Sequence, residues 1–251
     1  ALVAKRQRVA TLYPDVIAGR GWGVLDKFRY QIAPAQYSIG LQTFFATEKT
    51  IAGGVLKDRP ILVATEASHV KDATYAAVLK YAKEGGTVIA LPEGFATNEY
   101  GDPRDTAELI PAEGGAPFDE GVREIKLGKG RVLCIDRLDG PDPEAKPDGG
   151  KRQAVYRRVL YKAMGEAGLL DPVRLRPADG DPDALLGWDV RSAKVQGGHV
   201  LCALRGGPAP LKLETDRPVK RIVDLVAGKD VPPEDCKVDA VASLFLVELA
   251  E

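Results

Sequence analysis

The sequence predicts an α/β domain over residues 1–170, with a mostly parallel sheet and helices on both faces, followed by a small all-β sandwich over residues 171–251. Two observations support this fold class. Two apolar runs, residues 61–65 and 87–91, flank a segment with helical periodicity, which is typical of a right-handed βαβ unit. Beyond residue 171, strand candidates separated by Gly, Pro and Asp recur about every ten residues, as in β-sandwiches.

The first elements precede the βαβ unit. Residues 9–13 are rich in β-forming side chains and stop at Pro14, which predicts a strand. Residues 15–28 hold three glycines around Trp22 and predict a mobile loop. Pro34 suits the first turn of a helix that extends to about residue 43, and residues 44–46 predict a short second strand.

The βαβ unit itself is bounded by helix and strand breakers. The helix over residues 71–84 ends at Gly85-Gly86, because glycine adopts the left-handed C-terminal conformation at the lowest cost. Pro92 then closes the strand over residues 87–91. The resulting sheet, strands alternating with helices, is flavodoxin-like.

The remaining segments complete the two layers. Residues 93–120 predict a loop around a short helix at 106–110, and residues 122–125 and 131–135 predict a hairpin. A Pro- and Gly-rich stretch over residues 139–150 precedes a basic amphipathic helix over residues 151–167. Residues 171–183, with three prolines, are the expected junction with the sandwich.

Composition excludes several classes of function. Lys and Arg number 35 and Asp and Glu 36, so the net charge of −1 argues against nucleic acid as the main partner. No stretch approaches the ~18 apolar residues of a membrane span, and we expect no membrane partner. Three widely spaced cysteines and two histidines predict neither a disulfide framework nor a metal site. No glycine-rich phosphate-binding motif is present, so we expect no cofactor.

Five features together resemble the β-galactosidase trimerisation domain. They are the strand at 61–65, the helix that ends at Gly85-Gly86, the strand at 87–91, the turn at 127–130 and the helix at 151–167. That domain is a member of the class I glutamine-amidotransferase-like fold. In that family the module follows a TIM-barrel glycosidase domain and precedes a small β-sandwich, so the resemblance covers nearly the whole chain. It implies a non-catalytic accessory and oligomerisation module of a glycoside hydrolase, with the catalytic carboxylates on the barrel.

The resemblance also says where a nucleophile would lie. Active members of the wider fold carry a Cys, assisted by His, on a sharp turn after a central strand. Here that turn reads Leu91-Pro92-Glu93-Gly94, a degenerate nucleophile elbow without Cys, Ser or Thr. Cys134 and Cys202 lie in apolar strands and are expected to be buried, whereas Cys236 lies in a polar stretch and is expected to be an exposed thiol.

Other polar residues have a functional and a structural interpretation. Four carboxylates follow strand ends, where ligands bind in parallel sheets: Glu66, Glu93, Glu99 and Asp102. A pair of them could act as the catalytic carboxylates of a glycosidase. We favour the interpretation that all four are solvated acids in loops. A capping or surface role is expected for His69, and an exposed turn position for His199. A solvated basic helix face is expected for Arg152, Arg157 and Arg158.

Aromatic side chains in the two long connections predict a contact surface. Aromatics are enriched in interface cores and also stack on sugar rings. The candidate interface or carbohydrate-binding residues are Trp22, Phe28, Tyr30, Phe95 and Tyr100. The expected partners are a second copy of the chain or an upstream catalytic barrel domain, with carbohydrate as a further ligand.

Two other functions remain open. One is a free-standing hydrolase of the amidotransferase-like fold, and the other is a carbohydrate-binding module that acts through Trp22 or Trp188. The chain starts at Ala1, without an initiator Met or a signal-peptide pattern, which suggests a mature chain or an excised piece. The sequence assigns no compartment, and membership of a glycosidase is compatible with a secreted or periplasmic location.

Overall fold

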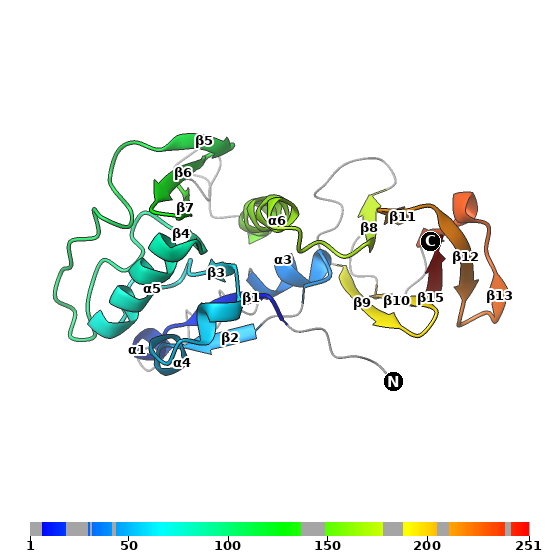
Figure 1. The fold of residues 1–251 in the computed structure, drawn as a ribbon, viewed down its shortest axis with the longest axis horizontal. Helices are drawn as coiled ribbons and strands as arrows, with labels where there is room; N and C mark the ends of the chain where they lie inside the picture. The colour runs from blue at the N-terminus through cyan, green and yellow to red at the C-terminus, as the bar shows by residue number, and fades with distance from the viewer. Residues whose placement is uncertain are drawn as a thin grey trace.

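The computed structural model describes residues 7–18, 30, 32–41, 44–136, 149–177, 188–204, 211–238 and 242–250 of the 251 residues. They form two lobes side by side, an α/β layer and an all-β lobe (Figure 1). The strands of the first sheet all precede residue 136, and those of the other two sheets all follow residue 172. The predicted fold class, an α/β layer followed by a β-sandwich, is confirmed.

The α/β layer contains a seven-stranded sheet in the order β2-β1-β3-β4-β7-β6-β5. The strands from β2 to β7 in this order pair in parallel, and β6 and β5 are added antiparallel. Their bounds are Val9–Tyr13 (β1), Phe44–Thr47 (β2), Ile61–Val63 (β3), Thr87–Ala90 (β4), Ala116–Asp119 (β5), Val122–Leu127 (β6) and Gly130–Ile135 (β7). Ile61 is the register partner of Thr87, so the two apolar runs are neighbouring strands, as predicted.

Helices cover both faces of this sheet. One face carries α4 (Glu48–Ala52), the 3-10 helix η2 (Val55–Asp58) and α5 (Asp72–Glu84), and the other carries α3 (Ala33–Ser38) and α6 (Gly149–Glu166). Alternate strand residues serve the two cores: Leu62 and Val88 belong to the first, Ile61 and Ile89 to the second. Because both faces are buried, the central strands are mostly apolar.

Two connections near the start of the chain differ from the predictions. The helix expected to extend to residue 43 ends at Ser38, because Gly40 adopts a φ of 77°. A left-handed residue just past the last turn ends a helix. The segment predicted to be a loop from residue 15 begins with a short helix, α1 (Asp15–Ala18).

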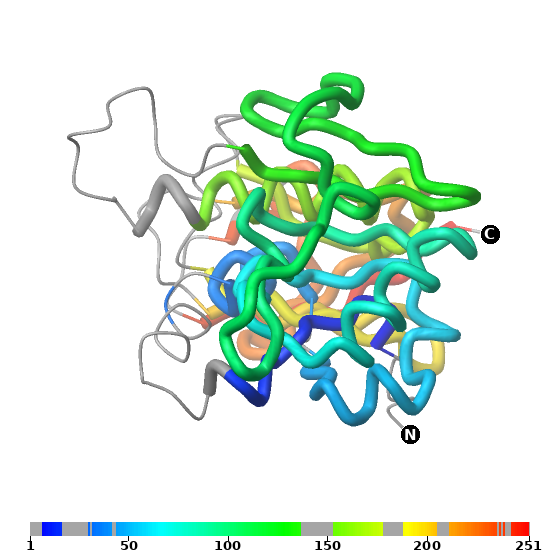
Figure 2. The backbone as a smooth tube through the Cα atoms, turned by 90° about the vertical axis from the view of Figure 1, so that its left-hand side faces the viewer, coloured from blue at the N-terminus to red at the C-terminus, as the bar shows by residue number. Residues whose placement is uncertain are grey.

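The segment between β4 and β6 also differs from its prediction. It contains the strand β5, where we expected a loop. In Figure 2 the green tube of this segment lies on the side that faces the viewer. The helix predicted at residues 106–110 is instead a turn, closed by the Ile110 N–H donating to the Thr106 carbonyl at 2.8 Å.

The all-β lobe packs two antiparallel sheets, β13-β12-β15-β10-β9 and β14-β11-β8, around one core. The largest fully buried side chain of that core is Trp188. The bounds are Val173–Pro177 (β8), Asp189–Val195 (β9), Gly198–Leu204 (β10), Leu211–Thr215 (β11), Val219–Asp224 (β12), Lys229–Asp230 (β13), Lys237–Val238 (β14) and Ala242–Leu249 (β15), with a 3-10 helix at Pro233–Asp235 (η4).

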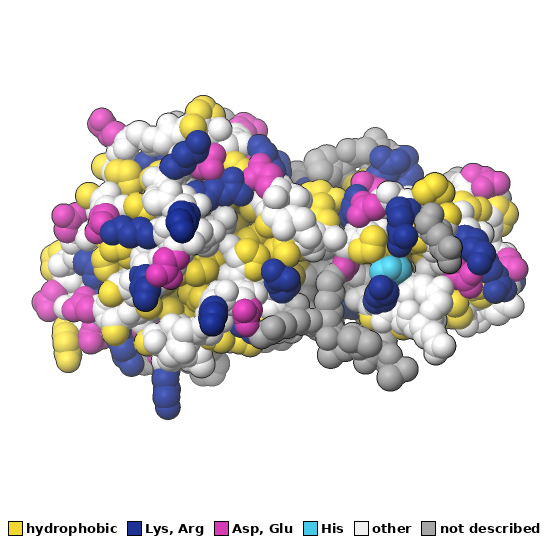
Figure 3. All heavy atoms as spheres, in the orientation of Figure 1, with side chains coloured by type: hydrophobic (Ala, Val, Ile, Leu, Met, Phe, Trp, Pro, Cys, Tyr) yellow, Lys and Arg dark blue, Asp and Glu magenta, His cyan; other side chains and the backbone are white. Residues whose placement is uncertain are grey.

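The two lobes touch through α3 and β9. The guanidinium of Arg191 lies over the ring of Tyr37, 4.5 Å from its centroid. On the face seen in Figure 3, basic and acidic side chains are interspersed over both lobes. None of the helices in the described ranges is long and apolar enough to span a membrane.

Candidate functional site

The carboxyl ends of β1, β3, β4 and β7 lie at one edge of the sheet, because these strands run parallel. Ligands of open parallel sheets bind beyond this edge. The acidic residues Glu66, Glu93 and Asp136 follow β3, β4 and β7 there. We therefore take this carboxyl edge as the candidate functional site.

The turn after β4 is the degenerate elbow predicted from the sequence. The Gly94 N–H donates to the Leu91 carbonyl at 2.9 Å. A Cβ on Gly94 would lie 2.9 Å from the same oxygen, so the turn tolerates little but glycine. Leu91 is buried, and Pro92 and Glu93 are exposed. The side chains that this turn presents to solvent thus include no nucleophile.

Phe95 was a candidate contact residue, and that prediction is wrong. Its side chain is fully buried, and its ring centroid lies 6.1 Å from that of Tyr75. The backbone at Phe95 has a φ of 63°, the one positive value among the described non-glycine residues. This conformation turns the chain back towards the loop after β3, where the Phe95 N–H donates to the Ala67 carbonyl at 2.7 Å. The left-handed turn therefore places the ring in the core.

One arginine holds the segment after β4 against the start of α5. Arg104 donates to the backbone carbonyls of Phe95 at 2.9 Å, Thr97 at 3.2 Å and Val70 at 2.9 Å, and also binds the carboxylate of Asp72. Its side chain is only 10% exposed. We call this set of contacts the arginine clamp. It explains why a connection without helices is nevertheless well packed.

The clamp supports a turn that presents Tyr100 to solvent. The Asn98 side-chain oxygen accepts hydrogen bonds from the backbone N–H groups of Tyr100 and Asp102, both at 2.9 Å. Gly101 completes the turn with a φ of 96°. Tyr100 is 80% exposed, the largest exposure among the large hydrophobic residues of the described ranges. The structure thus presents one predicted aromatic on a braced loop.

The other predicted aromatics are placed differently. Tyr30 is exposed, and its carbonyl accepts a hydrogen bond from the Gln153 side chain on α6. Trp22 and Phe28 lie outside the described residues. Trp188, the alternative sugar-stacking residue, is 1% exposed and belongs to the sandwich core, so it cannot stack on a ligand.

The four carboxylates singled out from the sequence differ in exposure. Glu66 is buried, contrary to the expected solvated position, and lies 3.4 Å from the Tyr156 hydroxyl. Glu93 is exposed, and Asp102 is part of the Asn98 turn. Glu99 is half-buried.

A further buried carboxylate, Glu48, was not singled out from the sequence. It accepts hydrogen bonds from the backbone N–H groups of Val16 at 3.1 Å and Lys71 at 2.8 Å, and from the Thr74 hydroxyl at 3.0 Å. Its position directly after β2 was the available signal. With its oxygens engaged by donors from two helix starts, Glu48 has a structural role.

Two of the three cysteines are unsuited to nucleophilic catalysis. Burial, and after it the neighbouring carboxylate of Asp136, raises the pKa of the Cys134 thiol to about 12. Cys236, predicted to be exposed, is buried against the sandwich core, and this burial raises its pKa to about 11. Cys202, expected to be buried, is half-buried in β10. The thiols of Cys134 and Cys236 are therefore protonated near neutral pH and are weak nucleophiles.

The histidines and the basic helix face complete the predicted residues. His69 is half-buried with its Nδ1 3.1 Å from the Ser68 hydroxyl, while His199 is half-buried in β10, not exposed in a turn. Arg157 is only 3% exposed, so the prediction of a fully solvated basic face on α6 is wrong at this residue. The side chain of Arg152 lies outside the described part of the chain. The described residues contain no group of three or more His, Cys, Asp or Glu that could hold a metal ion.

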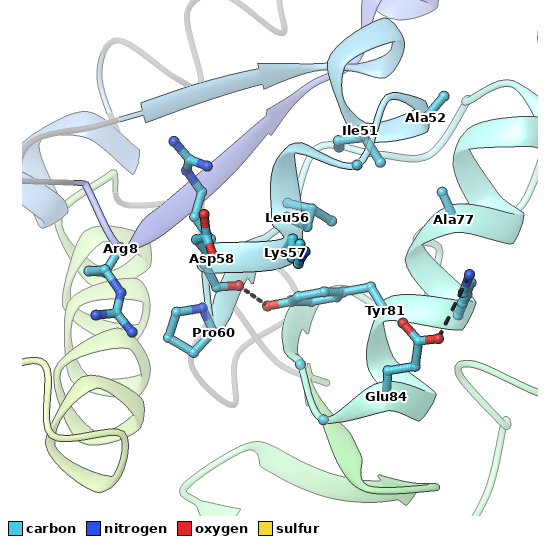
Figure 4. Close-up of a pocket in the computed structure, with 15 residues that line it drawn as sticks. Arg8, Ile51, Ala52, Leu56, Lys57, Asp58, Pro60, Ala77, Tyr81 and Glu84 are labelled. Atoms are coloured by element: carbon cyan, nitrogen blue, oxygen red, sulfur yellow. Dashed lines mark hydrogen bonds and ion pairs between the residues drawn. The ribbon is translucent and has the colours of Figure 1, made fainter.

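A cavity of about 870 Å³ lies at the opposite, amino edge of the sheet (Figure 4). The Tyr81 ring of α5 reaches across it, and its hydroxyl donates to the Arg59 carbonyl at 2.8 Å. Burial raises the pKa of this phenol above its ordinary value. A Cβ at Gly86 would lie 2.2 Å from the Tyr81 ring, so any other residue there would displace this ring.

Comparison with solved structures identifies proteins that share this fold. An exo-carrageenase GH42 from Bacteroides ovatus superposes with a TM-score of 0.68 at 16% identity, covering 98% of this chain and 30% of that one. A GH42 β-galactosidase, Gan42B, gives 0.63 at 13% identity, with coverages of 98% and 41%. The cold-adapted β-galactosidase from Rahnella sp. R3 gives 0.63 at 10% identity, with the same coverages. This chain has a glycoside hydrolase-related fold.

The glycoside hydrolase-related fold covers both lobes, since the superpositions span nearly the whole chain. The chain spans less than half the length of each of these structures. No family model and no curated protein matches the sequence.

Proposed function

We propose that this chain is a non-catalytic accessory and oligomerisation module of a β-galactosidase-like glycoside hydrolase, and that it makes its contacts through the carboxyl edge of the α/β layer. The observation that carries the proposal is Tyr100, an 80% exposed aromatic on a turn braced by Asn98 and the arginine clamp. The elbow sequence without a nucleophile and the high pKa of Cys134 support a role other than catalysis.

The braced turn lowers the entropic cost of a contact through Tyr100. Aromatic side chains are enriched among the few residues that dominate binding energy at interfaces. A residue whose backbone is already held in place loses less conformational entropy on association, so more of the burial of its ring contributes to affinity. Partners of the appropriate chemistry are a second copy of this chain or the catalytic domain of the same enzyme.

Sedimentation velocity of the chain over a micromolar concentration series tests the proposal. We expect reversible self-association that Tyr100→Ala weakens about 30-fold, the effect of losing about 2 kcal/mol at an interface hot spot. Val226→Ala is the matched control, because Val226 is 72% exposed but lies in the sandwich. A chain that stays monomeric in the presence of the remaining enzyme domains, or an equal effect of both variants, would refute the proposal.

The exposed ring of Tyr100 also favours a second candidate function, carbohydrate binding by ring stacking. Titration of the wild-type chain with galacto-oligosaccharides, followed by isothermal titration calorimetry, distinguishes the two. Saturable binding that disappears in Tyr100→Ala, without self-association, would favour the binding module.

A further inference from the structure

The two sheets of the sandwich differ in the face that each turns away from their common core. In the three-stranded sheet, the outward residues of β8 and β11 are charged: Arg174 pairs with Glu214, and Arg176 pairs with Lys212. This follows the usual alternation of an antiparallel sheet, with apolar side chains towards the core and polar ones away from it. The five-stranded sheet departs from this alternation, because its central strands are apolar on the outward face as well.

The strands β10 and β15 show this apolar outward face. Leu201 and its register partner Phe245 are buried in the sandwich core, whereas the next pair along, Cys202 and Leu244, points away from that core. The outward positions of the two strands, from Val200 and from Ala242 onwards, are Val200, Cys202, Leu204, Ala242, Leu244 and Leu246. All six are half-buried or exposed, and Leu204 is 48% exposed.

The apolar side chains continue onto the neighbouring strands. Val223 of β12 is the register partner of Leu246 in β15. On its other side Leu246 pairs with Val200 of β10, which pairs in turn with Ala193 of β9. Register partners project to the same side of a sheet, so these residues form one row across four strands. We define the apolar face by six residues: Ala193, Val200, Cys202, Val223, Leu244 and Leu246.

Two ion pairs flank the apolar face on opposite sides. On β9, the Arg191 Nε lies 2.6 Å from the carboxylate of Asp189, and on β12 the Arg221 Nε lies 2.9 Å from that of Asp230. An apolar centre with a polar rim is the usual arrangement of a specific protein interface. Because each pair has no net charge, two identical faces can meet without repulsion between like charges. An anionic membrane would instead be attracted by an excess of cations.

We propose that the apolar face binds the same face of a second copy of this chain, sheet against sheet about a twofold axis. Sheets that pack face to face lie about 10 Å apart, with strand directions within about 30° of each other. A twofold contact requires a self-complementary surface, which the central apolar row and its neutral rim provide. This contact lies on the sandwich and does not depend on the contact proposed for Tyr100.

The size of the face predicts the strength of the contact. Four strands about 4.8 Å apart and seven residues at about 3.4 Å each give a face of about 19 Å by 24 Å, or about 450 Å² in each copy. Two copies therefore bury about 900 Å², close to the roughly 1,000 Å² at which specific interfaces begin. We expect a weak, reversible dimer.

Sedimentation velocity over a micromolar concentration series tests the proposal in the Tyr100→Ala chain, which lacks the ring proposed as the contact at the carboxyl edge. We expect a reversible monomer–dimer equilibrium. Adding Leu246→Lys should weaken dimerisation at least about 30-fold, because the dimer would bury two cations without partners. Phe45→Lys is the matched control, since Phe45 is 46% exposed on the sheet of the other lobe, and it should leave dimerisation unchanged.

A second measurement leaves the apolar face unaltered. Cys134 and Cys236 are buried and have raised pKa values, so alkylation by iodoacetamide should occur first at the half-buried Cys202. In the Tyr100→Ala chain, alkylation of Cys202 should slow as the protein concentration rises, because dimerisation covers this thiol. The decrease in rate should follow the fraction of dimer that sedimentation measures.

The proposal is overturned if the Tyr100→Ala chain stays monomeric, if Leu246→Lys weakens the dimer no more than Phe45→Lys, or if alkylation of Cys202 is independent of concentration. The alkylation result decides the matter even where Leu246→Lys prevents folding. Self-association of the unsubstituted chain that Tyr100→Ala leaves unchanged would contradict the contact proposed at the carboxyl edge, and would support the contact through the sandwich.

Discussion

Replacing Arg104 by Ala should release the segment that carries Tyr100. The substitution removes the donors for the carbonyls of Phe95, Thr97 and Val70, at 2.9, 3.2 and 2.9 Å. A typical hydrogen bond contributes about 1 kcal/mol net, so the three together are worth about 3 kcal/mol. The ion pair with Asp72 adds little, because that carboxylate is 74% exposed and screened by solvent.

Native-state hydrogen exchange measures this loss where it occurs. The amide of Thr97 donates to the Ser68 carbonyl at 3.0 Å and that of Arg104 to the Ala96 carbonyl at 2.7 Å, so both report local opening. A loss of about 3 kcal/mol predicts exchange faster by about 100-fold in Arg104→Ala. The measurement is preferable to global denaturation, because a chain with two lobes need not unfold in one step.

Asp72→Asn is the matched control for the clamp. It removes only the exposed partner of Arg104 and should change the same amides by less than about fivefold, the effect of an exposed ion pair. The amide of Leu201 in the sandwich should be unaffected by either change. The reasoning fails if Arg104→Ala accelerates the Thr97 amide by less than about tenfold, or if Asp72→Asn has an equal effect.

Two further outcomes follow from burial and close contact. Burial raises the pKa of Cys134 to about 12 and that of Cys236 to about 11, from 9.0 for both thiols. The folded state therefore favours the protonated thiols, and their contribution to the free energy of unfolding is complete below pH 9. This contribution should decline as pH rises from 9 to 12, seen as a falling denaturation midpoint that substitution of both by Ala removes. Gly130→Ala should cost about 1–3 kcal/mol in urea denaturation, since its Cβ would lie 2.3 Å from the Ala82 carbonyl oxygen. Gly165→Ala, whose Cβ would meet only Leu170 at 3.5 Å, should be neutral or stabilising; equal losses would contradict this account.

Local sequence patterns were sufficient for the central regular elements of the α/β layer. The apolar runs that became β3 and β4, the helix that ends at Gly85, and the hairpin of β6 and β7 are all where periodicity and turn residues predicted them. Such patterns work because a strand buried on both faces, or a helix buried on one, imposes its period on the sequence.

Patterns of this kind failed in the long connections. The segment after β4 has no period, and its conformation depends on Arg104 reaching carbonyls up to 34 positions away in the chain. Whether Phe95 or Tyr100 faces solvent is decided by that clamp and by the left-handed backbone at Phe95, which hydrophobicity cannot encode.

The sequence by itself determined the βαβ unit of β3, α5 and β4, the change from α/β to all-β structure, and the absence of a nucleophile from the turn at Leu91–Gly94, because these depend on neighbouring residues. Only the tertiary structure decided the burial of Cys236 and Arg157 and the contacts of the arginine clamp. These properties arise where elements far apart in the chain pack together, and a residue's exposure and charge environment there depend on groups that its own neighbours in the sequence do not specify.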